Sequence, residues 1–379
     1  MKGGVIIKSF NQTLNYLVLG VAFSGLFFNF AILSMFDEYF LDNHSSYNWL
    51  ILIFALTLLI SGMFMSHFDG LLVMKRKTIT TIVFLILIFS TGWHTSTTSS
   101  LGLGLFQILN GICITYLILN SVISITTVNQ HIVEFPLYIS ILIILCAMGT
   151  LIINSLLSVL GAPHFIFLLL IFSYVFIGTL QLLLGESLLE TRSIQKLPFA
   201  LQSNLSLVYL IPFLFSFSIT TLYLTDFFPP LSWDSILIMG LIILCFTLQH
   251  KSLKVLKHPF QLTTVGILIS ALILPLTSIL VEGLLYLTVL AVLGLSLSSI
   301  YYSGMYIIAD SLKIYNQFTS LGFFYCSLLG GFIGGYLVQD LMGLFPMSSV
   351  FSLSFLLTGA SIFYIRQLAN HQSQLKIPR

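Results

Sequence analysis

Acidic residues at the ends of apolar segments are the groups in this chain most able to do chemistry. Asp37 and Asp226 each end a long apolar run, and the two runs finish alike, as Ala31-Ile-Leu-Ser-Met-Phe-Asp37 and Thr220-Thr-Leu-Tyr-Leu-Thr-Asp226. A carboxyl group held in an apolar wall resists ionisation, so it can load a proton and later release it. The pair is therefore a candidate coupling site for protons or a cationic substrate. The alternative is that both are ordinary acids at the level of the lipid headgroups.

Uncharged polar residues form a second set of candidates, because several recur at helical spacing and would form a polar stripe along a cavity. The candidate cavity residues are Asn29, Gln107, Asn110, Ser216, Thr220, Tyr223, Ser299, Tyr302 and Tyr306. Serine and threonine can instead join helices by hydrogen bonds, whereas tyrosines and amides are costly in lipid and favour a cavity. Such groups suit a lipophilic or weakly polar substrate. A sugar phosphate or a dicarboxylate would call for arginine or lysine within the spans.

The sequence also argues against disulfides, metal sites, enzyme activity and nucleic-acid binding. The four cysteines, Cys113, Cys146, Cys245 and Cys326, lie inside apolar runs without CxxC spacing, so we expect neither a disulfide nor a metal site. The chain has no Walker lysine, HExxH or GxSxG motif, so we expect no enzyme activity and no cofactor. The net charge of +2 is too small to indicate a nucleic-acid partner.

Composition assigns the chain to the membrane. Hydrophobic residues make up 58% of it and charged residues 7%, whereas soluble domains carry about a quarter charged residues. One span with a short loop uses roughly 30 residues, so the 379 residues predict about twelve spans. The runs are unbroken rather than alternating, which favours helices over barrel strands. We place the spans near 14–36, 47–66, 78–93, 101–127, 136–160, 164–184, 206–226, 234–249, 262–281, 284–308, 318–339 and 347–366.

Basic residues give the orientation. With the amino terminus inside, all 14 lysines and arginines lie on the cytoplasmic side, and the other side has acids but no Lys or Arg. This follows the positive-inside rule and supports the span count, because one missed span would break the pattern. Both ends are therefore expected in the cytoplasm, with the protein in a plasma membrane such as a bacterial inner membrane.

The two halves of the chain resemble each other. Each has its main basic cluster after its second span, at Lys75–Lys77 and Lys251–Lys257, and each has glycine in its fifth span. Two six-span halves of the same orientation are typical of transporters whose site lies between the halves. The predicted parts are a bundle at 1–184, a cytoplasmic linker at 185–205, a second bundle at 206–366 and a tail at 367–379.

Short motifs along the chain carry a resemblance to a known family. The segment 62–77 begins with glycine, contains an acid and ends on basic residues, and Gln107-Ile-Leu-Asn110-Gly111 follows in the fourth span. These segments, with Asn316–Gly335, resemble motifs of the major facilitator superfamily, and in particular compact exporters of drugs and small molecules. Departures are Ser66 at the usual acid, Gln107 at the usual arginine, and Thr150 in place of the proline of the exporter pair.

The resemblance implies a role for further residues. The inner gate would consist of Gly62, Asp69, Lys75 and Arg76. Independently of the resemblance, Gly330 and Gly334 form a small-xxx-small pattern that lets two helices approach closely, and we expect Gly111 and Gly149 to serve helix packing too. The resemblance also implies an all-α membrane protein of twelve helices in two bundles, with the first and seventh spans lining the cavity.

The expected function is secondary active transport of one small molecule by alternating access, with proton-coupled export as the leading hypothesis. The expected partners are the substrate, protons and the lipid bilayer, and we expect a monomer. One alternative is an importer or facilitator of a neutral nutrient. A second is a membrane enzyme or a non-transporting sensor. An enzyme would show clustered His, Asp or Glu within the spans, and a sensor would more often have a soluble domain.

Overall fold

The computed structural model describes residues 13–26, 29, 48–67, 76–94, 100–128 and 163–184, with isolated positions between 265 and 333. All of these residues are helical. A lipid environment explains this, because a helix satisfies its own backbone hydrogen bonds where no water is present.

Five helices are described: the N-terminal helix Thr13–Leu26, α2 Asn48–His67, α4 Arg76–His94, α5 Ser100–Val128 and α7 Pro163–Leu184. The last four agree with predicted spans to within two residues at each end. At about 1.5 Å per residue, the 19 residues of α4 reach roughly 28 Å, close to the bilayer's hydrocarbon thickness. The predicted first span continues to residue 36, and beyond Leu26 only Asn29 is described.

Length and hydropathy distinguish the described helices. Two contain a continuous stretch able to cross a membrane, Leu101–Val122 in α5 and Phe167–Leu184 in α7. Three contain shorter apolar stretches, which are Thr13–Leu26, Leu52–Met65 and Lys77–Trp93.

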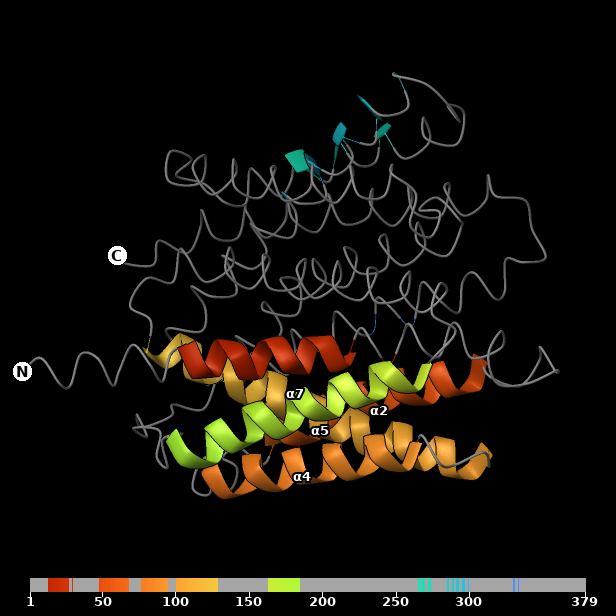
Figure 1. Ribbon diagram of the computed structural model, residues 1–379. Helices are drawn as coiled ribbons and strands as arrows, with labels where there is room; N and C mark the ends of the chain where they lie inside the picture. Colours follow the sequence, from red (N-terminus) through yellow and green to blue (C-terminus); the bar gives the residue numbers. More distant parts are fainter. Residues whose placement is uncertain are drawn as a thin grey trace, which may run out of the picture. The chain divides into compact units, whose positions relative to one another are not determined.

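The helices pack in a defined order. Helix α5 contacts α2 and α4, and α4 also contacts α7, with the axes running alongside one another in Figure 1. Side chains from Cys113 to Val122 are buried on every side of α5, which makes it the central helix of this group. Fully buried Leu87 of α4 and Leu117 of α5 belong to the apolar core.

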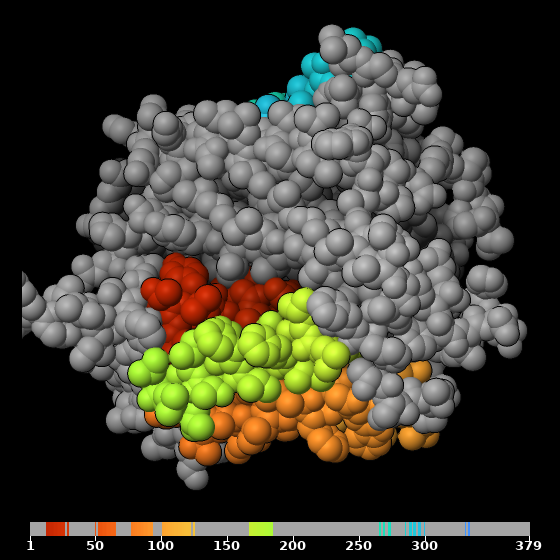
Figure 2. Space-filling view, viewed as in Figure 1, coloured from red at the N-terminus to blue at the C-terminus, as the bar shows by residue number. Residues whose placement is uncertain are grey.

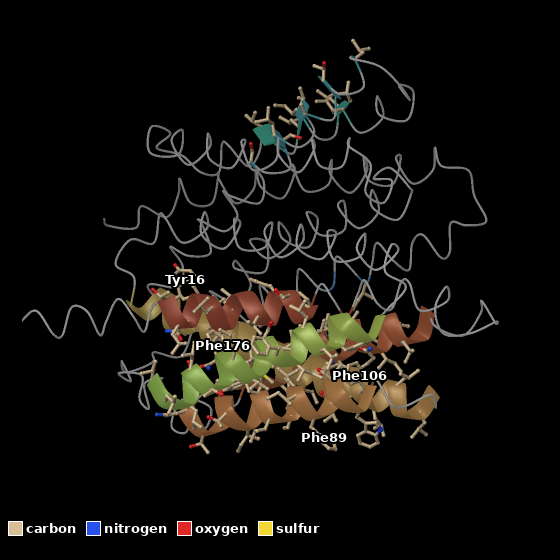
Figure 3. All side chains as sticks on the ribbon, viewed as in Figure 1. Tyr16, Phe89, Phe106 and Phe176 are labelled. Atoms are coloured by element: carbon tan, nitrogen blue, oxygen red, sulfur yellow. The ribbon has the colours of Figure 1, made fainter. Side chains whose placement is uncertain are left out.

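The outward faces of α4 and α7 are apolar. On α7, Leu168, Phe172 and Phe176 are more than half exposed, and the rings of Phe172 and Phe176 stack with centroids 6.5 Å apart. On α4, Phe89 lies at the outer edge of the helix in Figure 3, and its ring packs edge-on against Trp93. Figure 2 shows α7 as a continuous exposed ridge. An apolar outer face is suited to lipid rather than to water.

The chain divides into two compact units. The first consists of 1–130, 142–194 and 317–326, and it includes all five helices described above. The second consists of 131–141, 195–316 and 327–379. The predicted linker 185–205 and tail 367–379 lie outside the described residues.

Candidate functional site

A buried polar cluster joins three helices of the first unit. Asn110 of α5 donates from Nδ2 to Oδ1 of Asn29 at 3.3 Å and accepts at Oδ1 from Ser90 Oγ of α4 at 2.8 Å. Asn29 also donates from Nδ2 to the carbonyl oxygen of Gly25, 2.6 Å away in the N-terminal helix. All three polar side chains are buried. We call Asn29, Ser90 and Asn110 the amide cluster. Two predicted cavity residues thus meet here, and Ser90 is an addition that the sequence analysis did not make.

Gln107, the third predicted cavity residue on these helices, lies three residues before Asn110 on α5. Its side chain is 1% exposed and its Oε1 has no hydrogen-bond partner. Two hydroxyl groups are likewise buried without a hydrogen-bond partner: that of Thr91, next to Ser90 on α4, and that of Tyr174 on α7. A buried acceptor without a partner costs roughly 1–3 kcal/mol. These oxygens are therefore among the places where the first unit could still gain hydrogen bonds, together with Ser121 Oγ and Gln181 Oε1.

A second cluster lies further along α4 and α5. The Thr80 hydroxyl of α4 is 3.3 Å from the Tyr116 hydroxyl and accepts from Asn120 Nδ2 of α5 at 3.3 Å. We call Thr80, Tyr116 and Asn120 the threonine cluster. Thr80–Asn120 and Ser90–Asn110 are ten residues apart on each helix, in opposite directions, so the helices are antiparallel and the clusters lie about 15 Å apart. In the sequence, Tyr116 and Asn120 lie one helical turn apart inside an apolar span, and this spacing could have indicated the threonine cluster.

Glycines allow close approach between helices of the first unit. A Cβ at Gly111 of α5 would lie 2.9 Å from Thr57 Cγ2 of α2, too close for an ordinary contact. A Cβ at Gly178 of α7 would lie 3.1 Å from the Cβ and Cγ of Phe84 on α4. At Gly25 it would meet the Tyr174 hydroxyl. The sequence analysis predicted a role in helix packing for Gly111 but not for Gly25 or Gly178.

The remaining candidates divide into described and undescribed residues. Ser299 of the second unit is buried, and its hydroxyl donates to the Leu295 carbonyl one turn earlier at 2.8 Å. Gly62 is buried in α2, Arg76 begins α4, and Gly330 is helical. Outside the described residues lie Asp37, Asp69, Lys75, Gly149, Ser216, Thr220, Tyr223, Asp226, Tyr302, Tyr306 and Gly334.

The described helices are uncharged apart from Arg76 and Lys77 and the histidines at helix ends. None of the described residues is an aspartate or a glutamate. Amides and hydroxyls can donate and accept hydrogen bonds, but they do not ionise near neutral pH. The polar groups buried in the part of the chain that the structure describes are thus neutral, and any carboxylate of this chain lies outside that part.

No protein-family model matches the chain, and no curated protein matches it. Solved structures do. The crystal structure of the human organic anion transporter MFSD10 (TETRAN) has a TM-score of 0.70 at 13% identity, covering 94% of this chain and 99% of that one. The chain has the fold of the major facilitator superfamily. FucP, a transporter of that superfamily in the outward conformation, has a TM-score of 0.66 at 12% identity, with 94% and 98% covered.

The likeness confirms the predicted major facilitator fold, and with it an all-helical, multi-pass membrane architecture. The match extends over nearly the whole of both chains. The count of twelve helices and the position of the two ends stay predictions. At 12–13% identity the likeness shows the fold and assigns no role to single residues.

Proposed function

We propose that the protein is a secondary active transporter that moves one small molecule across the membrane by alternating access. The observation that carries this is the fold, shared over 94% of the chain with two transporters of the major facilitator superfamily. In this architecture a substrate site lies between two helical bundles that rock about it. The bundles proposed here are 1–184 and 206–366, with both ends in the cytoplasm.

The substrate we propose is lipophilic or weakly polar and carries no strong charge. The buried polar side chains of the first unit are amides and hydroxyls. Apart from Arg366, the final residue of the last one, the predicted spans contain no lysine or arginine to bind a phosphate or a dicarboxylate. MFSD10 is described as an organic anion transporter. An anion would need a basic partner, which this chain could supply only from its loops and the ends of its helices, so we favour a neutral ligand.

The direction we propose is export, driven by protons, with Asp37 and Asp226 as the coupling acids. They occupy equivalent positions in the predicted repeat and end the two spans expected to line the cavity. The described helices contain no carboxylate that could take this role. The inner gate would use Gly62, Asp69 and the basic cluster that begins before α4.

The first experiment asks whether the protein transports at all. Ligands that raise the thermal midpoint of the purified protein are selected first, since a ligand that binds only the folded state must stabilise it. The protein is then reconstituted in liposomes, and counterflow of the selected radiolabelled ligand is measured. We expect saturable exchange that empty liposomes lack. Ligand binding without any exchange would favour the sensor alternative.

The second experiment addresses coupling. Asp37→Asn, Asp226→Asn and the double variant are assayed with and without a pH gradient. We expect gradient-driven accumulation to be lost while downhill exchange is retained, because exchange needs binding but no net proton movement. A double variant that still concentrates substrate like the parent would remove both acids from the mechanism. Comparing right-side-out with inverted vesicles separates export from import of a nutrient.

A third experiment tests the topology. Arg76 and His94 lie at opposite ends of α4. In intact cells, a single cysteine at position 94 should react with an impermeant reagent, and one at position 76 should not. Reaction at position 192, in the proposed linker, would contradict the scheme of two six-helix bundles.

A further inference from the structure

Three carboxamide side chains of the first unit lie near one another, and one of them has an unused hydrogen-bond acceptor. Asn110 of α5 donates to Asn29 at 3.3 Å. Gln107 lies three residues before Asn110, or about 4.5 Å along the axis of α5. Its side chain is 1% exposed, and its Oε1 has no hydrogen-bond partner. We call Asn29, Gln107 and Asn110 the carboxamide triad.

The position of Gln107 on α5 follows from the contacts of its neighbours. At about 100° per residue, position 107 lies between positions 110 and 111 when the helix is viewed along its axis. Asn110 meets Asn29, and Gly111 approaches Thr57 of α2. Gln107 is therefore on the face of α5 between these two contacts, within one turn of the bonded pair.

The triad can form more hydrogen bonds than the structure shows. A carboxamide has two N–H donors and an oxygen that can accept twice. The bond from Asn110 Nδ2 to Asn29 uses one hydrogen, and the bond from Asn29 Nδ2 to the Gly25 carbonyl oxygen uses another. Each nitrogen has a second hydrogen to offer, and Gln107 Oε1 can accept. Donors and an acceptor are thus present together in a buried place.

Ser90 of α4 fixes the orientation of the central carboxamide. Its hydroxyl donates to Asn110 Oδ1 at 2.8 Å, with a second contact at 3.2 Å to the Leu87 carbonyl oxygen. The oxygen of Asn110 is therefore directed to α4, and its nitrogen is directed to Asn29. Polar groups that are held in place before a ligand arrives lose less entropy when it binds.

We propose that the carboxamide triad binds the polar group of the substrate, and that this group is neutral and carries a donor beside an acceptor, as a primary amide does. The N–H of the substrate donates to Gln107 Oε1, and its carbonyl oxygen accepts from Asn29 or Asn110. The rest of the substrate is apolar. This inference rests on the transport function proposed above and names the substrate class for the same site.

Other polar groups fit the triad less well. A buried carboxylate or phosphate needs a cationic partner. Among the described residues, arginine and lysine occur at Arg76 and Lys77, which begin α4 about 20 Å from Ser90 along the helix axis. A ketone or an ether has no donor and leaves Gln107 Oε1 without a partner. A group with both a donor and an acceptor uses both kinds of atom in the triad.

Three pairs of probes test the inference by binding alone. Benzamide, cinnamamide and cyclohexanecarboxamide each carry a primary amide on an apolar body, and each is compared with its N,N-dimethyl counterpart. Methylation removes both N–H donors and keeps the carbonyl oxygen. Dissociation constants are measured from the thermal midpoint of the purified protein at increasing probe concentration, because a ligand that binds only the folded state raises the midpoint.

We expect at least one primary amide to bind about five- to tenfold more tightly than its dimethyl counterpart, as one neutral hydrogen bond allows. Benzoate, which has the ring of benzamide and a carboxylate, should not shift the midpoint. Gln107→Met keeps the length of the side chain without an acceptor, and should bind both members of the pair equally weakly. Ser121→Ala, which removes another unpartnered oxygen of α5, should keep the preference of the parent.

The inference would be overturned by the absence of a shift with all three primary amides, by equal affinity within every pair, or by tighter binding of benzoate. A preference that survives Gln107→Met would also overturn it, because the size of the methyl groups would then decide. Gln107→Leu is a second variant with the same expectation should the methionine variant not fold.

Binding and transport are measured separately. Amide binding that depends on Gln107, in a protein without counterflow, would contradict the proposed function alone. Counterflow of a compound whose binding is unchanged by Gln107→Met would contradict this inference alone.

Discussion

Helices α5 and α7 are alike in hydropathy and opposite in environment. Both contain a continuous apolar stretch, with mean hydropathy of 1.8 for Leu101–Val122 and 2.3 for Phe167–Leu184. In α5, 67% of that stretch is buried, and in α7 only 28%. Apolar character therefore indicates that a segment crosses the membrane, and the few polar side chains indicate what it faces.

The polar side chains of the two helices show this difference directly. On α5, Asn110 and Asn120 bond to side chains of α4. On α7, the hydroxyls of Ser173 and Thr179 lie on the outward side and donate to carbonyls four residues earlier, at 2.9 and 2.7 Å. A hydroxyl satisfied within its own helix can face lipid, whereas an amide needs a partner from another helix.

The largest expected effect is on the close contact between α5 and α2. Gly111→Leu should lower the free energy of unfolding by about 3 kcal/mol, because even a Cβ there lies within 3.1 Å of two Thr57 atoms. The measurement is unfolding by a denaturing detergent in mixed micelles. Gly92→Leu is the matched control, since no described atom beyond its own turn of helix lies within 4 Å of the position of its Cβ. Equal losses of unfolding free energy for the two variants would mean that the loss comes from helix propensity and not from the contact with Thr57.

The next effect tests whether the outer face of α7 meets lipid. Phe172→Arg, in the middle of α7, should cost about 2.5–3.5 kcal/mol on scales of membrane insertion. Phe172→Leu should cost little. The readout is the inserted fraction of α7 in a glycosylation-based insertion assay. An arginine variant that inserts as well as the parent would show that this face meets water or protein instead.

A smaller expected effect compares two serine-to-alanine substitutions, one at a hydroxyl bonded to another helix and one at a hydroxyl bonded within its own helix. Ser90→Ala removes the 2.8 Å bond to Asn110 and should cost about 0.6 kcal/mol, typical of interhelical hydrogen bonds in membranes. Ser173→Ala removes only a bond within α7 and should change stability by less. Both are measured by the same detergent unfolding. A greater loss from Ser173→Ala would reverse the comparison between the helices.

The smallest effect concerns two buried tyrosines. Tyr174→Phe removes a hydroxyl without a partner and should leave stability unchanged or slightly raised. Tyr116→Phe removes the contact with Thr80 and should lower stability by about 0.5 kcal/mol. Thermal midpoints of the purified variants are compared. A clear loss for Tyr174→Phe would show that its hydroxyl has a partner in the membrane.

Much of the fold could be predicted from the sequence, because the bilayer imposes one dominant rule. The bounds of α4 were predicted to within two residues, because its apolar run ends at Arg76 and His94. The same is true of α7, whose apolar run begins at Pro163 and ends at the polar segment after Leu184. The motifs at 62–77, 107–111 and 316–335, together with the repeat of two halves, indicated the major facilitator fold. The candidate site was predicted only in part. Asn29 and Asn110 were named, but their partner Ser90 was not.

The sequence by itself determined that the chain is a multi-pass helical membrane protein, since 7% charged residues cannot cover a soluble surface. Only the tertiary structure decided which polar groups meet. Pairing Ser90 with Asn110 and Thr80 with Asn120 depends on the antiparallel register of α4 and α5. Likewise, the difference between Gly111, pressed against Thr57, and Gly92, with open space around it, depends on which helix lies opposite. Hydropathy is a property of each segment, whereas a contact is a property of two.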